Sequence, residues 1–153
     1  MKINFKISYF YQVRFFKENQ LPVSTALWDP KWYHDFKDQE YLFRDKNNVI
    51  NGLRIPALSP QSSECTQCSD KNTSMCLFMK SYMLQLRSLD FNSVLDQLYL
   101  YAEFYLSHFD EVDIVLLVHE TPSNPCSERG PLIKWFSENG IELSEFKKGD
   151  DNL

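Results

Sequence analysis

The hydrophobic positions change period several times along the chain, and each change marks an expected element. Residues 3–9 alternate apolar with polar side chains, which is the period of a β-strand. A second strand is expected over residues 21–27, and the apolar run 112–118 predicts a buried central strand. Short apolar pieces within 49–55 indicate a small hairpin or edge strand around Asn-Gly. Residues 141–146 predict a short last strand beside the central one.

Two segments in the middle of the chain have helical spacing instead. Apolar and polar residues over 76–87 recur with the period of a helix and so predict one. Thr73 or Ser74 is expected to cap this helix. The next helix begins after Asp90 and carries an apolar stripe typical of a core-facing helix. This stripe is formed by Phe91, Val94, Leu95, Leu98, Ala102 and Tyr105.

Strands that alternate with helices predict an α/β fold. We expect a single three-layer domain over residues 1–153, with a mostly parallel sheet flanked by helices. The polar, turn-rich stretch 59–76 contains cysteines and is expected to be an inserted loop. A length of 153 residues, 43% hydrophobic and 15% aromatic, suits one folded domain with a sizeable core.

The composition also limits location and partners. No apolar run approaches a membrane span, and the N-terminus lacks the apolar region of a signal peptide, so we expect a cytoplasmic protein. The net charge of -5 argues against broad nucleic-acid binding. Residues 1–54 nevertheless carry nine Lys/Arg and six Asp/Glu, whereas residues 55–153 carry seven and fifteen. This imbalance allows a positive pocket for an anionic small molecule or nucleotide.

Three of the four cysteines follow the spacing Cys65-x2-Cys68-x7-Cys76. Two thiolates at this separation can converge on one tetrahedral ion, and a chain without an export signal is not expected to carry a disulfide framework. The spacing predicts a zinc ion, with an iron–sulfur cluster and ordinary thiols as alternatives, and no other cofactor is expected. The fourth ligand stays open among Cys126, a histidine, Asp70 and Glu64.

The loop after the central strand carries further candidate chemistry. His119 and Glu120 are candidate acid/base groups, because ligands bind near the carboxyl ends of strands in open α/β sheets. Cys126 precedes the next predicted helix, whose positive end favours a thiolate or a bound anion, and Arg129 is close by. Cys126 could therefore be a nucleophile, an anion contact or a metal ligand.

The stretch 27–36 gathers aromatic and basic residues around a proline. Aromatic faces beside a cation can clamp a planar or anionic ligand. The alternative is that Trp28 and Trp32 cover the rim of the core.

These blocks together resemble the DUF488 family. The matching residues are Ile7-Ser8-Tyr9 with Arg14, Leu27-Trp28-Asp29-Pro30-Lys31-Trp32, and Leu117–Glu120 with Asn124–Arg129 and Trp135–Ile141. The resemblance covers most of the chain, and its last block is the most specific. Where many members carry Cys-His-Arg, this chain has Cys126-Ser127-Glu128-Arg129, so a Cys–His mechanism would need His119 or His34 in space.

The resemblance implies a compact α/β domain of a bacterial and phage family, associated with nucleotide or nucleic-acid processing but with no settled reaction. Our first hypothesis is therefore a domain that recognises or processes a nucleotide-like, anionic substrate. The alternatives are a non-catalytic ligand- or protein-binding module, such as a phage-type inhibitor or sequestering protein, and a metal-stapled structural protein. In the first hypothesis the catalytic candidates are Cys126, Arg129, Glu120 and His119, and the opposite wall is formed by Ser8, Tyr9, Arg14, Lys31 and Trp32.

Overall fold

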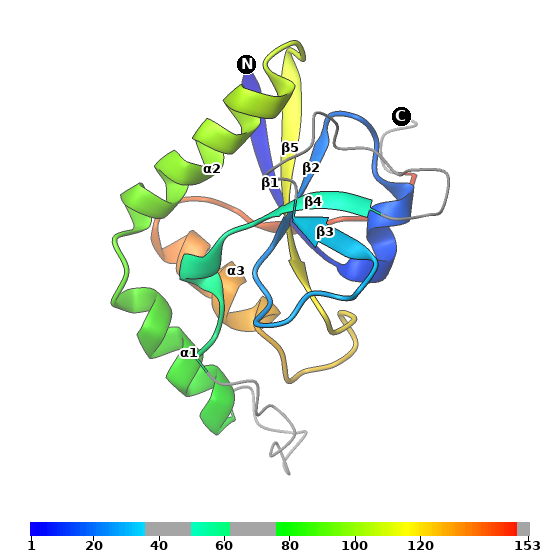
Figure 1. Cartoon of the computed structure of the whole chain (residues 1–153). Helices are drawn as coiled ribbons and strands as arrows, with labels where there is room; N and C mark the ends of the chain where they lie inside the picture. The colour runs from blue at the N-terminus through cyan, green and yellow to red at the C-terminus, as the bar shows by residue number, and fades with distance from the viewer. Residues whose placement is uncertain (36–49, 62–75, 150–153) are drawn as a thin grey trace.

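A six-stranded sheet runs through the protein in the order β3-β4-β2-β5-β1-β6, and its neighbouring strands pair in parallel (Figure 1). The computed structural model describes residues 1–35, 50–61 and 76–149. The predicted α/β fold with a mostly parallel sheet is confirmed. The strands are β1 (Lys2–Tyr9), β2 (Gln20–Ser24), β3 (Tyr33–Asp35), β4 (Ile50–Arg54), β5 (Glu111–Val118) and β6 (Ser144–Glu145).

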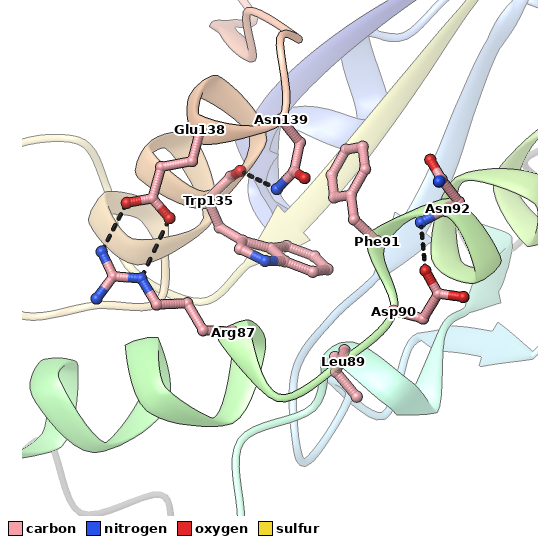
Figure 2. A pocket seen from close by; sticks show the side chains of 8 residues that line it. All are labelled: Arg87, Leu89, Asp90, Phe91, Asn92, Trp135, Glu138 and Asn139. Carbon is pink, nitrogen blue, oxygen red and sulfur yellow. Dashed lines mark hydrogen bonds and ion pairs between the residues drawn. The ribbon is translucent and has the colours of Figure 1, made fainter.

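Helices cover both faces of this sheet. α1 (Leu77–Arg87), α2 (Phe91–Leu106) and α3 (Arg129–Glu138) share one apolar core with the sheet, while η1 (Phe10–Phe15) packs in a second core on the other face. A short turn, η3 (Pro56–Leu58), follows β4. Arg87 and Glu138 form an ion pair between the ends of α1 and α3 (Figure 2). None of the helices in the described ranges is both long and apolar enough to span a membrane.

The central strand explains why the fold has two cores. Residues 112–118 of β5 are all buried, as the continuous apolar run predicted. Successive side chains of a strand point to opposite faces. Accordingly Ile114 and Leu116 pack with the three α-helices, whereas Val115 and Leu117 pack with η1.

Two strand predictions were wrong. β6 pairs with β1 and not with the central strand, because both edges of β5 are already taken by β1 and β2. β4 is an interior strand between β2 and β3 rather than part of a hairpin. Its Gly52 reads as a turn residue in the sequence, but a Cβ at this position would lie 2.1 Å from the hydroxyl oxygen of Tyr33. The glycine therefore allows the Tyr33 ring to pack against the strand.

The boundaries of other elements differ in smaller ways. β2 ends at Ser24, earlier than the predicted residue 27, and β3 lies within the aromatic stretch that was not expected to form a strand. The N-cap of α1 is Cys76, whose Sγ accepts a hydrogen bond from the Met79 backbone N–H. Thr73, Ser74 and most of the expected inserted loop lie outside the described residues.

Candidate functional site

The chain leaves the neighbouring strands β1 and β5 toward opposite faces of the sheet. After β1 it enters η1 on one face, and after β5 it reaches α3 on the other. Ligand sites of open α/β sheets form at such switch points, outside the carboxyl ends of the strands. We call the ends of β1, β2 and β5 the carboxyl edge. Residues 119–129, named loop 119–129 below, follow β5 at this edge.

Arg129 is buried at the start of α3 and connects loop 119–129 with β6. Its Nε donates to Glu145 Oε1 at 2.8 Å, and its Nη1 donates to the Glu120 carbonyl oxygen at 2.8 Å. Within the described part of the chain, three buried atoms of these side chains have no hydrogen-bond partner: Arg129 Nη2, Glu120 Oε2 and Glu145 Oε2. Buried polar atoms are normally paired, so this edge retains unused hydrogen-bonding capacity.

Glu128 is a buried carboxyl group immediately before α3. Thr25 Oγ1 lies 2.9 Å from Glu128 Oε2 and 2.9 Å from the Leu117 carbonyl oxygen. The Thr25 hydroxyl is within donating distance of both oxygens and shares its single hydrogen between them. Burial raises the pKa of Glu128 to about 8; the Thr25 hydrogen bond opposes this rise and the negative charge of Glu120 adds to it. Glu128 is therefore largely protonated at neutral pH.

Glu145 is held in a similar environment. Burial raises the pKa of Glu145, while the charge and the hydrogen bond of Arg129 act in the opposite direction. The buried part of the carboxyl edge thus contains more carboxyl groups than cations, and this excess disfavours a bare anion there.

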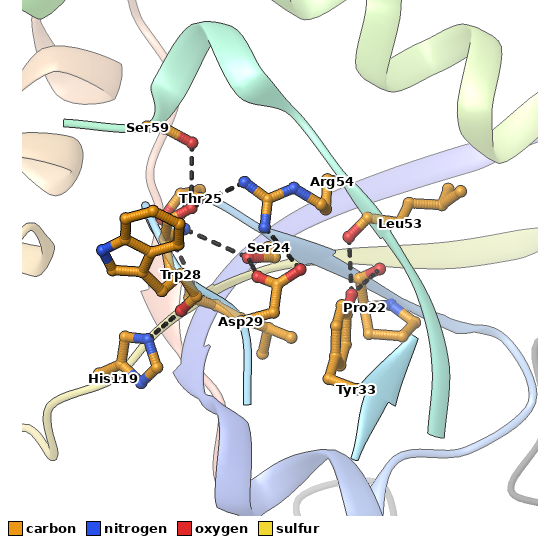
Figure 3. A network of polar contacts seen from close by, with 12 residues as sticks. Pro22, Ser24, Thr25, Trp28, Asp29, Tyr33, Leu53, Arg54, Ser59 and His119 are labelled. Atoms are coloured by element: carbon orange, nitrogen blue, oxygen red, sulfur yellow. Dashed lines mark hydrogen bonds and ion pairs between the residues drawn. The ribbon is translucent and has the colours of Figure 1, made fainter. Parts of the chain in front are cut away.

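Trp28 and His119 form an exposed rim on the same edge. The Trp28 side chain is 71% exposed. The His119 Nε2 atom makes a hydrogen bond with the Trp28 carbonyl oxygen, which joins the segment after β2 to loop 119–129 (Figure 3). The His119 ring also packs against Phe10, with the ring centroids 4.9 Å apart.

An ion pair fixes the backbone on both sides of Trp28. Arg54 Nη1 lies 2.6 Å from Asp29 Oδ2, and its Nη2 donates to the Ala26 carbonyl oxygen at 3.1 Å. Ser24 Oγ donates to Asp29 Oδ1 at 2.5 Å (Figure 3). Because these contacts precede and follow Trp28, the exposed indole is presented by a well-fixed segment and not by a loose one.

Cys76 and Cys126 meet where α1 and the approach to α3 begin. Their Sγ atoms lie 3.5 Å apart, too far for a disulfide between these two residues, yet each of them is disulfide-bonded. None of the described cysteines is a free thiol. The described residues contain no group of three or more His, Cys, Asp or Glu side chains placed to hold a metal ion. Cys65 and Cys68, the other predicted ligands, lie outside the described residues.

The predicted opposite wall divides between two environments. Ser8 is fully buried, and by strand alternation it faces the η1 side, away from Arg129. Tyr9 accepts a hydrogen bond from Gln12 Nε2 through its hydroxyl oxygen at 2.7 Å. Trp32 packs edge-on against Phe10, the residue that also contacts His119.

The two predicted cations of this wall are exposed. Arg14 donates to the Tyr11 carbonyl oxygen at 2.8 Å, and its guanidinium lies 3.9 Å from the centre of the Tyr11 ring. Both of these contacts lie within its own turn. Lys31 is exposed in the segment that presents Trp28.

Sequence reasoning singled out Arg129 and Glu120 as candidates, but it did not single out three buried residues of the same edge. Thr25, Glu128 and Glu145 stand among ordinary polar residues, and nothing in their local spacing marks them as buried. No protein-family model, curated protein or solved structure matches the chain.

Proposed function

We propose that the protein recognises a nucleotide-like ligand at the carboxyl edge, with a planar base stacked on Trp28. The observation that carries this proposal is the exposed indole on a segment fixed by Asp29 and Arg54, beside His119. A rigidly held indole presents a broad accessible face on which a planar ligand can stack. Stacking of a base on such a ring contributes about 1–3 kcal/mol.

The polar groups beneath this rim favour a base over a bare phosphate. Arg129 is already paired with Glu145, so its charge is largely neutralised, but one donor and two acceptors there have no partner among the described residues. The edge of a nucleobase offers both donors and acceptors, which suits this set. These atoms are buried, so their use requires a movement of loop 119–129. Lys31, three residues after Trp28, supplies an exposed positive charge for a phosphate.

Processing of the ligand, as opposed to recognition, would rely on Glu128 more than on Cys126. A nucleophilic cysteine acts as a free thiolate, and Cys126 is not a free thiol. Glu128 instead keeps a transferable proton near neutral pH. The acid/base roles of Glu120 and His119 stay predictions.

We also propose that the Cys65-x2-Cys68-x7-Cys76 spacing holds a zinc ion, which adds to the stability of the domain. Cys76 is disulfide-bonded in the structure, so this proposal concerns the reduced protein, in which the thiolate is available to a metal. Membership of the DUF488 family and a cytoplasmic location stay predictions as well.

Ligand titration tests the recognition proposal directly. We would titrate the purified protein with purine and pyrimidine nucleoside mono- and triphosphates and with nicotinamide dinucleotides, by calorimetry and tryptophan fluorescence. At least one of them is expected to bind, and Trp28→Ala is expected to weaken binding about 5- to 150-fold, the equivalent of about 1–3 kcal/mol.

The matched control is Phe104→Ala, because Phe104 is a 79% exposed aromatic residue on α2. This variant is expected to bind as the wild type does. Absence of binding across the series, or equal binding by Trp28→Ala, would contradict the proposal and favour a protein-binding module.

A further inference from the structure

The first half of β1 lies at an open edge of the sheet. β1 pairs with β5 along its whole length, but on its other side β6 pairs only with Lys6 and Ile7. Among the described residues, no strand therefore flanks residues 2–5 on that side. An unpaired stretch of strand presents backbone N–H and C=O groups to which another extended chain can bind.

Two backbone hydrogen bonds show which residues of β1 face the open edge. The Lys2 N–H donates to the Asp110 carbonyl oxygen at 2.8 Å, on the β5 side. The Ile7 carbonyl oxygen accepts from the Phe146 N–H at 2.8 Å, on the β6 side. Backbone groups of successive strand residues point to alternate sides of the strand. The backbone groups of Ile3, like those of Ile7, therefore point to the open edge.

A hollow of about 550 Å³ lies along this edge, between β1, α2 and the segment before β6. Three apolar side chains that line it, Ile3, Phe5 and Ile141, belong to the larger core or pack against it. The Tyr99 ring of α2 completes this lining and packs edge-on against Phe5, with the ring centroids 5.8 Å apart. The volume is within the usual range of ligand pockets, so apolar side chains of a short extended segment fit here.

Exposed carboxylates surround the hollow. Glu142 lines it, and Asp96 and Glu103 are exposed about one turn to either side of Tyr99 on α2. Both lysines of β1 are already paired with carboxylates of β5. A basic partner therefore complements this edge. A second copy of the chain does not, because two-fold pairing of the same edge would bring these carboxylates together.

We propose that the open edge of β1 binds a basic, extended peptide segment of a partner protein, which adds to the sheet as a strand beside residues 2–5. The backbone of the segment pairs with Ile3, its apolar side chains enter the hollow at Tyr99, and its Lys or Arg side chains meet Glu142. This surface lies at the start of β1, whereas the ligand site of the proposed function lies at the carboxyl edge. The two proposals are therefore independent.

Synthetic peptides with blocked ends test this proposal by NMR titration of the full chain. The first probe is a hexapeptide that alternates Lys and Val. It is compared with a hexapeptide that alternates Glu and Val, and with the Lys-Val peptide N-methylated at every backbone amide. We expect the Lys-Val peptide to shift the amide signals of Ile3 and Phe5, and to bind at least about 10-fold more tightly than either of the others.

A proline variant tests the backbone of the open edge. Ile3→Pro removes the N–H that points to this edge, and the ladder with β5 stays intact because the backbone of Ile3 does not face β5. The variant is expected to bind the Lys-Val peptide at least about 10-fold more weakly, since a donor is lost and the ring occupies the edge. The matched control is Ile3→Val, which keeps the N–H and should bind as the wild type does.

A charge reversal tests the basic character of the partner. Glu142→Lys should weaken binding of the Lys-Val peptide about 3-fold or more at low salt. The matched control is Glu18→Lys, because Glu18 is an exposed carboxylate before β2, on the far side of β5. This variant should bind the peptide as the wild type does.

Four results would overturn the proposal. Unchanged Ile3 and Phe5 signals with every peptide would remove the site, and equal binding by the N-methylated peptide would exclude strand addition. Equal binding by the Glu-Val peptide would exclude a basic partner. Shifts of the same signals on dilution of the protein alone, with a dimer in sedimentation, would assign the edge to a second copy. The N-methylated peptide leaves the protein unaltered, so the test stays decisive if Ile3→Pro fails to fold.

Discussion

Two buried polar clusters lie at the two ends of β5, and they are paired very differently. Asp113, near the start of the strand, is 6% exposed, and both of its carboxylate oxygens are bonded. It contacts three side chains at 3.0 Å each: Gln20, Asn4 and Lys6. At the carboxyl edge, Arg129, Glu120 and Glu145 instead leave three buried atoms without partners among the described residues.

The two clusters shift carboxyl pKa values in opposite directions. Burial alone would raise the pKa of Asp113, but the hydrogen bonds from Gln20, Asn4 and Lys6, with the Lys6 charge, lower it below its ordinary value. At the carboxyl edge, burial prevails and raises the pKa of both Glu128 and Glu145. Fully paired groups contribute to stability, whereas incompletely paired groups with raised pKa values are typical of functional sites. The comparison thus separates a fully paired end of the sheet from an incompletely paired one, and the second is the end that we propose as the ligand site.

The largest expected effect is at Glu128. Its folded pKa of about 8 lies above the ordinary value of 4.5, so the folded state holds a proton that the unfolded state releases first. The stabilisation is complete below pH 4.5 and is lost as the pH rises through about 8. This shift corresponds to at most roughly 5 kcal/mol of unfolding free energy. Glu128→Gln keeps a neutral side chain of the same shape and should remove most of the decline, measured by urea unfolding at about pH 5 and about pH 9. The raised pKa of Glu145 accounts for the decline that remains.

The matched control for this prediction is Glu142→Gln, because Glu142 is exposed and close in the chain to the same edge. This variant should retain the alkaline decline of the wild type. A parallel decline in Glu128→Gln would show that the carboxyl group is not held protonated, and would weaken the contrast between the two clusters.

Asp113→Asn should have a smaller effect with the opposite dependence on pH. Because the folded pKa of Asp113 is lowered, its stabilisation is present above its ordinary value of 3.8 and is lost as the pH falls through the folded pKa. The substitution should cost about 2 kcal/mol near neutral pH, since it removes the charge that pairs with Lys6. Urea unfolding from neutral to acidic pH should show a shallower loss in the variant. An equally steep loss would assign the acid sensitivity to other carboxyl groups.

The sequence predicts those features that depend on local periodicity. The buried strand at 112–118 and the apolar stripe of α2 follow from spacing alone, and the structure confirms both. The pairing of β6 and the interior place of β4 depend on which strand edges remain free, which spacing does not encode. Gly52 illustrates the same limit. A glycine is needed at this position because the ring of Tyr33, a residue distant in the chain, packs against the strand there.

The same distinction applies to the carboxyl edge. Its position and Arg129 could be predicted, because a polar loop after a buried strand marks the end of that strand. The protonation of Glu128 could not be predicted, because it depends on burial and on Thr25, which is 103 positions away. The proximity of Cys126 to Cys76 is likewise a result of helix packing.

The smallest expected effect, at the exposed ion pair of Arg87 and Glu138, tests whether burial underlies the comparison. Arg87 Nη2 lies 2.6 Å from Glu138 Oε2, a shorter contact than the 3.0 Å between Lys6 and Asp113. The Arg87 and Glu138 side chains are 45% and 37% exposed, however, against 17% and 9% for Lys6 and Asp113. Exposed ion pairs contribute little to the free energy of unfolding, because water and salt screen their charges and because two long side chains must be ordered.

Arg87→Gln should therefore leave the urea midpoint of unfolding unchanged within error, at low and at high salt. Glu138→Gln and the double variant should behave in the same way, so that a double-mutant cycle gives no resolvable coupling. If Arg87→Gln instead destabilised the protein as much as Asp113→Asn, contact length would outweigh burial. The burial of the fully paired cluster at the start of β5 would then not explain its contribution to stability. The contrast with the carboxyl edge would depend only on the atoms that have no hydrogen-bond partner there.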